Sequence, residues 1–103
     1  MTAHVMSTAD PKDRSLPTTV EDQTRRTLEN IKACVEAANG TMADIYKVVV
    51  MLKDPRDYRK MNTVRAEYFV KEPPVSTCFR ADLMSPDILV EIEAAAYVPQ
   101  ADG

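Results

Sequence analysis

The amino-acid sequence predicts an α/β domain of the α+β type, in which two helices cover one face of a single mixed sheet. Two segments repeat apolar residues at helical spacing, and other segments are rich in β-branched and aromatic residues. The two kinds of segment alternate along the chain, which then ends in two consecutive strands. Because each helix must bury its apolar stripe, both helices are expected to pack on the sheet.

The first helix is predicted over residues 19–38. Thr18 and Thr19 are candidates for its N-cap, because their hydroxyls can accept a hydrogen bond from the first turn. Asn39 and Gly40 follow the helix and are residue types that often end one in the left-handed conformation. The apolar stripe that would face the sheet consists of Val20, Leu28, Ile31, Val35 and Ala38.

A second helix is predicted to begin at Asp54 and Pro55. Aspartate is a favoured N-cap residue, and proline fits the first helical position because no hydrogen bond needs its missing N–H there. Pro73 and Pro74 end the segment. The residues at helical spacing are Tyr58, Met61, Val64, Arg65, Tyr68 and Phe69.

Strands are predicted at residues 45–52, 75–81 and 88–97, with a further short strand at 4–8. In residues 88–97 one alternating set of side chains is apolar. The other set mixes acidic and apolar residues and consists of Leu89, Glu91, Glu93, Ala95 and Tyr97. A monomer would expose this second, partly apolar face, so the pattern predicts a homo-oligomer.

The length of 103 residues fits one domain, with residues 1–18 and 99–103 expected to be loose. The content of 45% apolar and 28% charged residues is typical of a globular protein. A net charge of −3 argues against nucleic-acid binding, which needs a basic surface. No apolar run approaches the about 20 residues of a membrane-spanning helix, so no membrane partner is expected.

The cysteines and the single histidine bear on the chemistry. Cys34 and Cys78 lie on different predicted elements without the close spacing of a metal site, and His4 is the only histidine. The pattern predicts reduced thiols in a cytoplasmic protein. No metal and no cofactor are expected, and no catalytic pair of serine or cysteine with histidine is supported.

Separated motifs occur in a fixed order along residues 19–98. Residues 21–31 (EDQTRRTLENI) and 61–69 (MNTVRAEYF) precede 74–77 (PVST) and 90–94 (VEIEA). Together they resemble the RidA/YjgF family, the reactive intermediate deaminases of UK114 type. The resemblance implies a chorismate-mutase-like fold and a homotrimer with small-molecule clefts between neighbouring subunits.

The resemblance also implies a chemistry. Many members of the family hydrolyse reactive enamines or imines, with an arginine that binds the substrate carboxylate and a glutamate that positions water. Glu91 stands at the glutamate position and is the implied catalytic residue. Val75 stands at the arginine position and offers neither charge nor donor, while Ser76 and Thr77 beside it are implied to line the cleft.

Arg80 is the nearest arginine along the chain that could replace the lost one. It lies five residues beyond Val75, about 16 Å along an extended strand, and an odd separation directs it to the opposite face. A surface or interface ion pair is therefore the alternative role for Arg80. The pattern does not determine where Arg25, Arg26 and Arg65 lie relative to the cleft.

Two further features of the resemblance remain open. Glu93 shares a strand face with Glu91, so the two carboxylates are either an acid–base pair or separate groups with structural roles. Members of the family begin with a β-hairpin that carries a glycine-rich turn and a tyrosine near the cleft. Its first strand, the tyrosine and the cleft glycine have no counterpart in this sequence, which predicts a shortened N-terminal region. Either the trimer covers the strand edge that this exposes, or the cleft is more open than usual.

Three functions are compatible with these residues. The first is a divergent enamine or imine hydrolase that acts on a non-standard substrate through Glu91, with weak or absent deamination of 2-aminoacrylate. The second is a non-catalytic small-molecule-binding or accessory protein. The third is RNA cleavage, suggested by the basic residues between Lys53 and Arg65, although such a run is more often the solvated face of a helix. Whether the protein is an enzyme is left open by the sequence.

Overall fold

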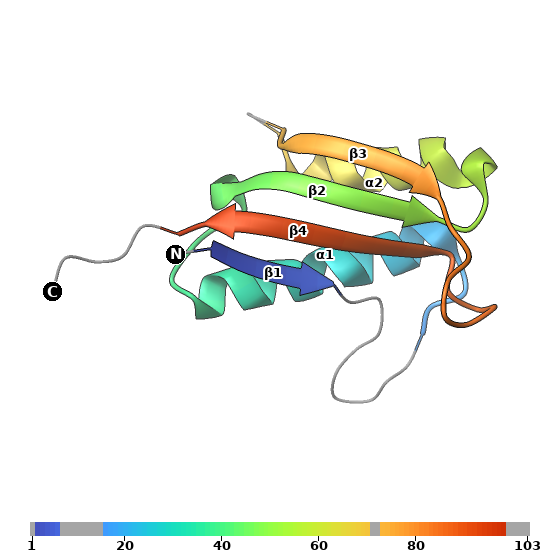
Figure 1. Cartoon of the computed structure of the whole chain (residues 1–103), viewed down its shortest axis with the longest axis horizontal. Coiled ribbons are helices and arrows are strands. Elements are labelled where there is room, and N and C mark those ends of the chain that lie inside the picture. The colour runs from blue at the N-terminus through green and yellow to red at the C-terminus, as the bar shows by residue number, and fades with distance from the viewer. Residues whose placement is uncertain (1, 7–15, 71–72, 99–103) are drawn as a thin grey trace, which may run out of the picture.

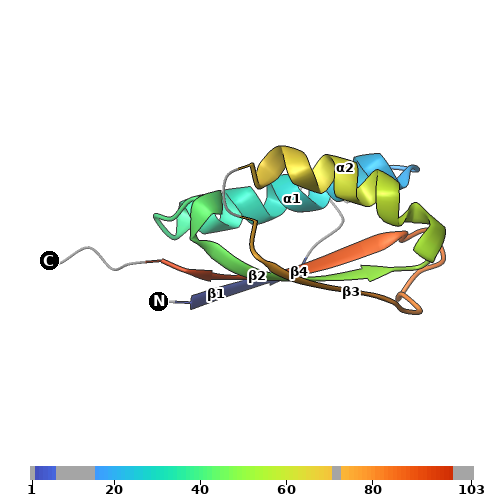
Figure 2. The same ribbon diagram turned by 90° about the horizontal axis from the view of Figure 1, so that it is seen from above.

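Two helices lie side by side on one face of a four-stranded sheet (Figures 1 and 2). The computed structural model describes residues 2–6, 16–70 and 73–98. Its elements are β1 (Thr2–Met6), α1 (Val20–Ala37), β2 (Ile45–Leu52), α2 (Tyr58–Tyr68), β3 (Val75–Arg80) and β4 (Val90–Tyr97). The sheet order is β1-β4-β2-β3; β3 is parallel to β2, and the other pairs are antiparallel. The predicted fold class is confirmed.

Helix α1 begins and ends where the sequence predicts. The Thr19 hydroxyl accepts a hydrogen bond from the Asp22 N–H at 3.1 Å, as an N-cap does. At the other end Asn39 adopts the left-handed conformation, with a φ of 68°. Gly40 has a different role, because a Cβ there would lie 2.7 Å from a methyl group of Val98. Asn39 therefore ends the helix, and Gly40 allows the chain to pack closely beyond β4.

Helix α2 starts later than predicted. The Asp54 carboxylate accepts the Arg56 N–H at 2.9 Å, but the turn that it caps is a short 3₁₀ helix, Pro55–Asp57. The α-helix itself begins at Tyr58, whose side chain is exposed and does not belong to the apolar stripe. Only Met61 and Val64 of that stripe are fully buried.

The strands differ from the predicted ranges by two residues or fewer at each end that is described. Strand β3 ends at Arg80, and β4 begins at Val90, because Ile88 is held in a turn by Ser85. The short N-terminal strand runs over Thr2–Met6. The rest of the predicted 4–8 strand, residues 7–8, lies outside the described residues, as do most of the segments expected to be loose.

The core lies between the helices and one face of the sheet, here named the covered face. It contains Val48, Val50 and Leu52 of β2 and Val90, Ile92, Ala94 and Ala96 of β4. The helices contribute Leu28, Ile31, Val35 and Met61. Because side chains alternate along a strand, Lys47, Val49, Met51, Glu91 and Glu93 point to the opposite, bare face, which neither α1 nor α2 covers (Figure 2).

A buried glutamine of α1 forms hydrogen bonds with the segment that leads into β4. Gln23 has no exposed surface. Its Nε2 donates to the carbonyl oxygens of Pro17 and Asp87, both at 2.8 Å, and its Oε1 accepts the Leu89 N–H at 2.7 Å. These bonds give both the nitrogen and the oxygen of the Gln23 side chain a partner, and they hold the chain in place just before β4.

Candidate functional site

The predicted site residues divide between the two faces of the sheet. Val75 pairs with Lys47 and Thr77 with Val49, so both belong to the bare face with Glu91. Ser76 pairs with Val48 and belongs to the covered face. The alternation along β3 therefore separates residues that are adjacent in the sequence.

Within one chain Glu91 is remote from Val75. Glu91 is level with Met51 across β4 and β2, whereas Val75 is level with Lys47. Two strand spacings across and four residues along correspond to about 16 Å. The structure thus places Glu91 and Val75 on one face but does not bring them together in one protomer.

Glu91 lies among apolar and acidic neighbours on the bare face. Its strand partner is Met51, and Phe79 lies beyond Met51 on β3. Glu93 lies two residues further along β4, opposite Val49. Glu91 is partly buried, while Phe79 is 48% exposed. A carboxylate in such surroundings can accept a proton from water or from a bound molecule.

Arg80 lies at the far end of β3, away from Val75. It pairs with Leu52, so it belongs to the covered face, as the odd separation predicts. Its charge acts on Asp54, whose pKa is lowered to about 2, chiefly by a hydrogen bond from Arg56 and to a lesser degree by Arg80. The structure does not bring Arg80 to the other predicted binding residues.

The structure brings a different arginine to β3. Arg65 of α2 donates from one terminal nitrogen to the Ser76 hydroxyl and from the other to the Asn62 side-chain oxygen, both at 2.6 Å. Its guanidinium therefore lies one residue from Val75, on the covered face. Only the Asn62–Arg65 spacing of three residues, which puts both on one helix face, could have suggested this from the sequence.

The thiol of Cys78 is close to the same group. Cys78 is partly buried on the covered face, and burial raises its pKa, while the charge of Arg65 acts in the opposite direction. A raised pKa keeps the thiol protonated, which disfavours a nucleophilic role. Both cysteines are free.

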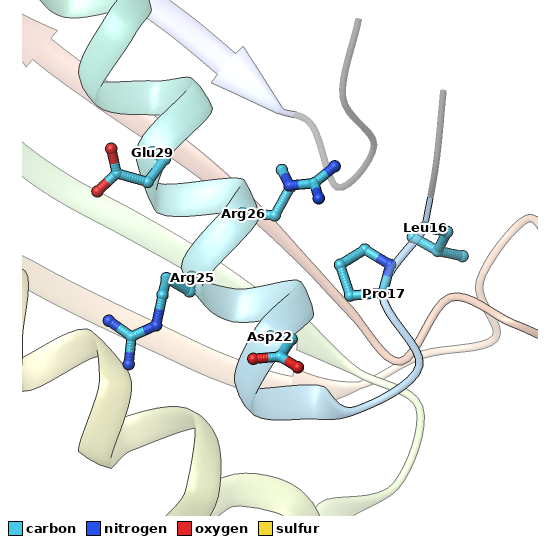
Figure 3. Close-up of a pocket in the computed structure, with 6 residues that line it drawn as sticks. All are labelled: Leu16, Pro17, Asp22, Arg25, Arg26 and Glu29. Atoms are coloured by element: carbon cyan, nitrogen blue, oxygen red, sulfur yellow. The ribbon is translucent and has the colours of Figure 1, made fainter. Parts of the chain in front are cut away.

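A hollow of about 530 Å³ lies beside the first turns of α1 (Figure 3). Arg25 extends from it toward α2 and Arg26 extends the other way (Figure 3). The Arg25 guanidinium binds the Glu67 carboxylate at 3.0 and 3.2 Å, which raises the pKa of Arg25. Because its polar groups diverge, this hollow does not resemble a binding site.

Two negative findings concern the described part of the chain. Residues 2–6, 16–70 and 73–98 contain no group of three histidine, cysteine or acidic side chains that could hold a metal ion. Within the same residues, neither helix has the length and apolar character needed to cross a membrane.

Comparisons with known proteins match most of this chain. The family profile described as Endoribonuclease L-PSP matches residues 6–98. A RutC family protein of Pyrococcus horikoshii is 49% identical over 78 residues, which cover 76% of this chain and 62% of that protein. A RutC family protein of Pyrococcus abyssi is 42% identical, with coverage of 76% and 61%. The chain thus spans about three fifths of the length of these curated relatives.

Solved structures agree with the sequence comparison. RidA from an Antarctic Psychrobacter superposes with a TM-score of 0.84 at 28% identity, covering 93% of this chain and 77% of that one. A YjgF-family protein from Mycobacterium tuberculosis has a TM-score of 0.77 at 34% identity, with coverage of 80% and 70%. The order of the motifs, the helix-covered sheet and these matches together assign the chain to the RidA/YjgF family.

Proposed function

We propose that the protein is a homotrimer with small-molecule clefts between subunits, and that it hydrolyses an enamine or imine other than 2-aminoacrylate. The observation that supports this most directly is the bare face of the sheet. It combines a partly buried carboxylate, Glu91, with exposed apolar side chains that neither α1 nor α2 covers. Residues 1–103 would act as one domain, and the two free cysteines fit a reducing, cytoplasmic location.

The exposed apolar side chains favour association through the bare face. Phe79 is 48% exposed, Tyr97 is 62% exposed and Val75 is 71% exposed. Each buried Å² of apolar surface contributes about 25 cal/mol, so covering these side chains favours an assembly. Closing three such sheets around one axis would also remove the open edge that β3 presents.

An assembly also explains how the predicted site could form. Val75 and Thr77 lie on the edge strand β3, and Glu91 lies on the interior strand β4. Because about 16 Å separates Val75 from Glu91 in one chain, a single small ligand requires residues from two copies. The edge of one subunit placed against the bare face of the next would supply them.

The proposed chemistry assigns one role to each side chain. Glu91 accepts a proton from a water molecule while the water oxygen bonds to the carbon of the substrate C=N group. The nitrogen takes up that proton from Glu91, which gives a carbinolamine. The hydroxyl proton then moves to the nitrogen, and the C–N bond breaks to release ammonia and a carbonyl product. Thr77 can donate a hydrogen bond to the ligand, while Val75 contacts an apolar substituent. Without a guanidinium at position 75, a substrate carboxylate there would lack its usual bidentate partner.

Turnover of defined imines tests the catalytic part of this proposal. A flavin-dependent amine oxidase generates imines that lack a carboxylate from benzylamine or isopentylamine, and their disappearance is followed by competition with semicarbazide. We expect faster hydrolysis of at least one apolar imine than of 2-aminoacrylate, with an at least tenfold loss in Glu91→Gln. Glu21→Gln, on the opposite side of the sheet, is the matched control. Rapid 2-aminoacrylate turnover, or full activity in Glu91→Gln, would contradict the proposal.

The oligomeric part has its own test. Met51→Glu adds a charge at the centre of the bare face and is expected to shift the species in sedimentation equilibrium from trimer to monomer. Ala33→Glu, on the exposed surface of α1, should leave the trimer intact. A wild-type monomer at micromolar concentration would exclude the intersubunit clefts.

A second candidate is a non-catalytic binding or accessory protein, and the uncharged side chain at position 75 is the observation that favours it. In that case a ligand would bind at the subunit interface and would not be consumed. Ligand binding that survives in Glu91→Gln, without turnover in the wild type, would support this candidate. RNA cleavage stays a weaker prediction, because Arg56 in the basic region is already paired with Asp54 at 2.8 Å.

A further inference from the structure

A small cavity lies on the covered-face side of β3, between that strand and α2. Its volume is about 260 Å³, which is below the about 300 Å³ of the smallest pockets for drug-sized ligands. Apolar groups of Val48, Ala66, Phe69 and Pro74 form most of its wall. Asn62, Arg65 and Ser76 supply its polar groups.

The Arg65 guanidinium is held in place within this wall. One terminal nitrogen donates to Ser76 on β3, and the other donates to Asn62 one helical turn earlier, both at 2.6 Å. These bonds use two of the five N–H donors of the group, so three remain for a ligand. Because the helix and the strand already hold the Arg65 side chain in one conformation, little side-chain entropy would be lost when a ligand binds.

Arg65 differs from Arg25 and Arg56 in the charge of its hydrogen-bond partners. Arg25 forms an ion pair with Glu67 at 3.0 Å, and Arg56 forms one with Asp54 at 2.8 Å. Among the residues that the structure describes, the partners of Arg65 are the neutral oxygens of Asn62 and Ser76. The cavity therefore offers one uncompensated positive charge beside an apolar wall.

From this geometry we infer that the cavity binds a small monocarboxylate with a short apolar body. A planar guanidinium matches a carboxylate with two parallel hydrogen bonds. One positive charge balances a monoanion, whereas a phosphate would leave negative charge uncompensated in apolar surroundings. The site lies on the opposite face of the sheet from Val75 and Glu91 and is complete within one chain, so it is independent of the proposed hydrolase cleft.

Isovalerate and its uncharged isostere isovaleramide are suitable probes. Each is titrated into the isotopically labelled protein, and amide NMR shifts are followed. We expect isovalerate to shift the amides of Asn62, Ala66, Phe69 and Ser76, and to bind at least tenfold more tightly than isovaleramide. Arg65→Met should weaken isovalerate binding at least tenfold, whereas Arg59→Met, on the same helix but outside the cavity, should leave it unchanged.

Several outcomes would overturn the inference. They are equal binding of acid and amide, shifts that cluster around Glu91, undiminished binding in Arg65→Met, and no saturable shift with the folded wild-type protein. If Arg65→Met fails to fold, Ser76→Ala replaces it, since losing one anchor of the guanidinium should weaken isovalerate binding several-fold without removing the charge. The hydrolase proposal would be unaffected by failure here, because imine turnover at Glu91 tests it separately.

Discussion

The two faces of the sheet differ in how completely they are covered, although the same strands supply both. On the covered face Val50, Val90 and Ile92 are fully buried beneath the helices. On the bare face Phe79 is exposed and Glu91 is only partly buried. One alternating set of side chains thus builds the core, and the other set is available for association and chemistry.

The largest expected effect tests this division directly. Ile92→Ala should lower the free energy of unfolding by about 2–5 kcal/mol, because it leaves a cavity in the core. Met51→Ala, on the bare face of the adjacent strand, should cost less and should depend on protein concentration if subunit contacts contribute. Urea denaturation at several protein concentrations measures both. Equal and concentration-independent losses would contradict the division.

A second substitution tests the buried hydrogen bonds between α1 and the segment before β4. Gln23→Leu should destabilise the protein by about 1–3 kcal/mol, because the Pro17 and Asp87 carbonyls and the Leu89 N–H lose their buried partner. Glu36→Ala, on the exposed side of the same helix, should be nearly neutral. Hydrogen exchange of the Leu89 amide gives a local readout. Unchanged protection there would show that Gln23 does not fix the start of β4.

A smaller effect is expected at the edge of the covered layer, where α1 begins. Thr19→Ala removes the cap of the Asp22 N–H and should cost about 1 kcal/mol. Thr18→Ala is the matched control one residue earlier, where the side chain does not cap the helix. Thermal denaturation of both variants is sufficient. Equal losses would mean that the cap contributes nothing specific.

The smallest effect is expected at Asp54, which caps the 3₁₀ turn between β2 and α2. The hydrogen bond from Arg56 lowers the pKa of Asp54 to about 2 from its ordinary 3.8. Because the folded pKa lies below the unfolded one, Asp54 stabilises the protein above about pH 4, and this contribution is lost as the pH falls toward 2. Asp54→Asn should therefore be slightly less stable than the wild type at about pH 5, with the difference shrinking toward pH 2. A difference that stays constant with pH would exclude this linkage.

The sequence predicted the elements well, but it predicted only part of how the candidate site residues are arranged on the sheet. The caps at Thr19 and Asp54 act within a few residues, so local patterns located the start of α1 and the turn before α2. Strand β4 begins two residues later than predicted because Ile88 lies in a turn. That turn depends on a local hydrogen bond that the alternating pattern does not reveal. Parity along β3 correctly separated Arg80 from Val75. Parity could not predict how far Glu91 lies from Val75 along the sheet, because that distance depends on the register of three strands.

Local spacing, composition and the order of the motifs were enough to determine the fold class, the alternation of buried side chains and the family. Those properties depend on the period of each element and on residues that lie near one another in the chain. The two faces of β3 acquired their surroundings only in the tertiary structure. Arg65 meets Ser76, eleven residues away, because the connection after α2 returns the chain as a parallel strand beside β2. No local pattern encodes that contact, since the packing of α2 against the sheet determines which side chain reaches β3.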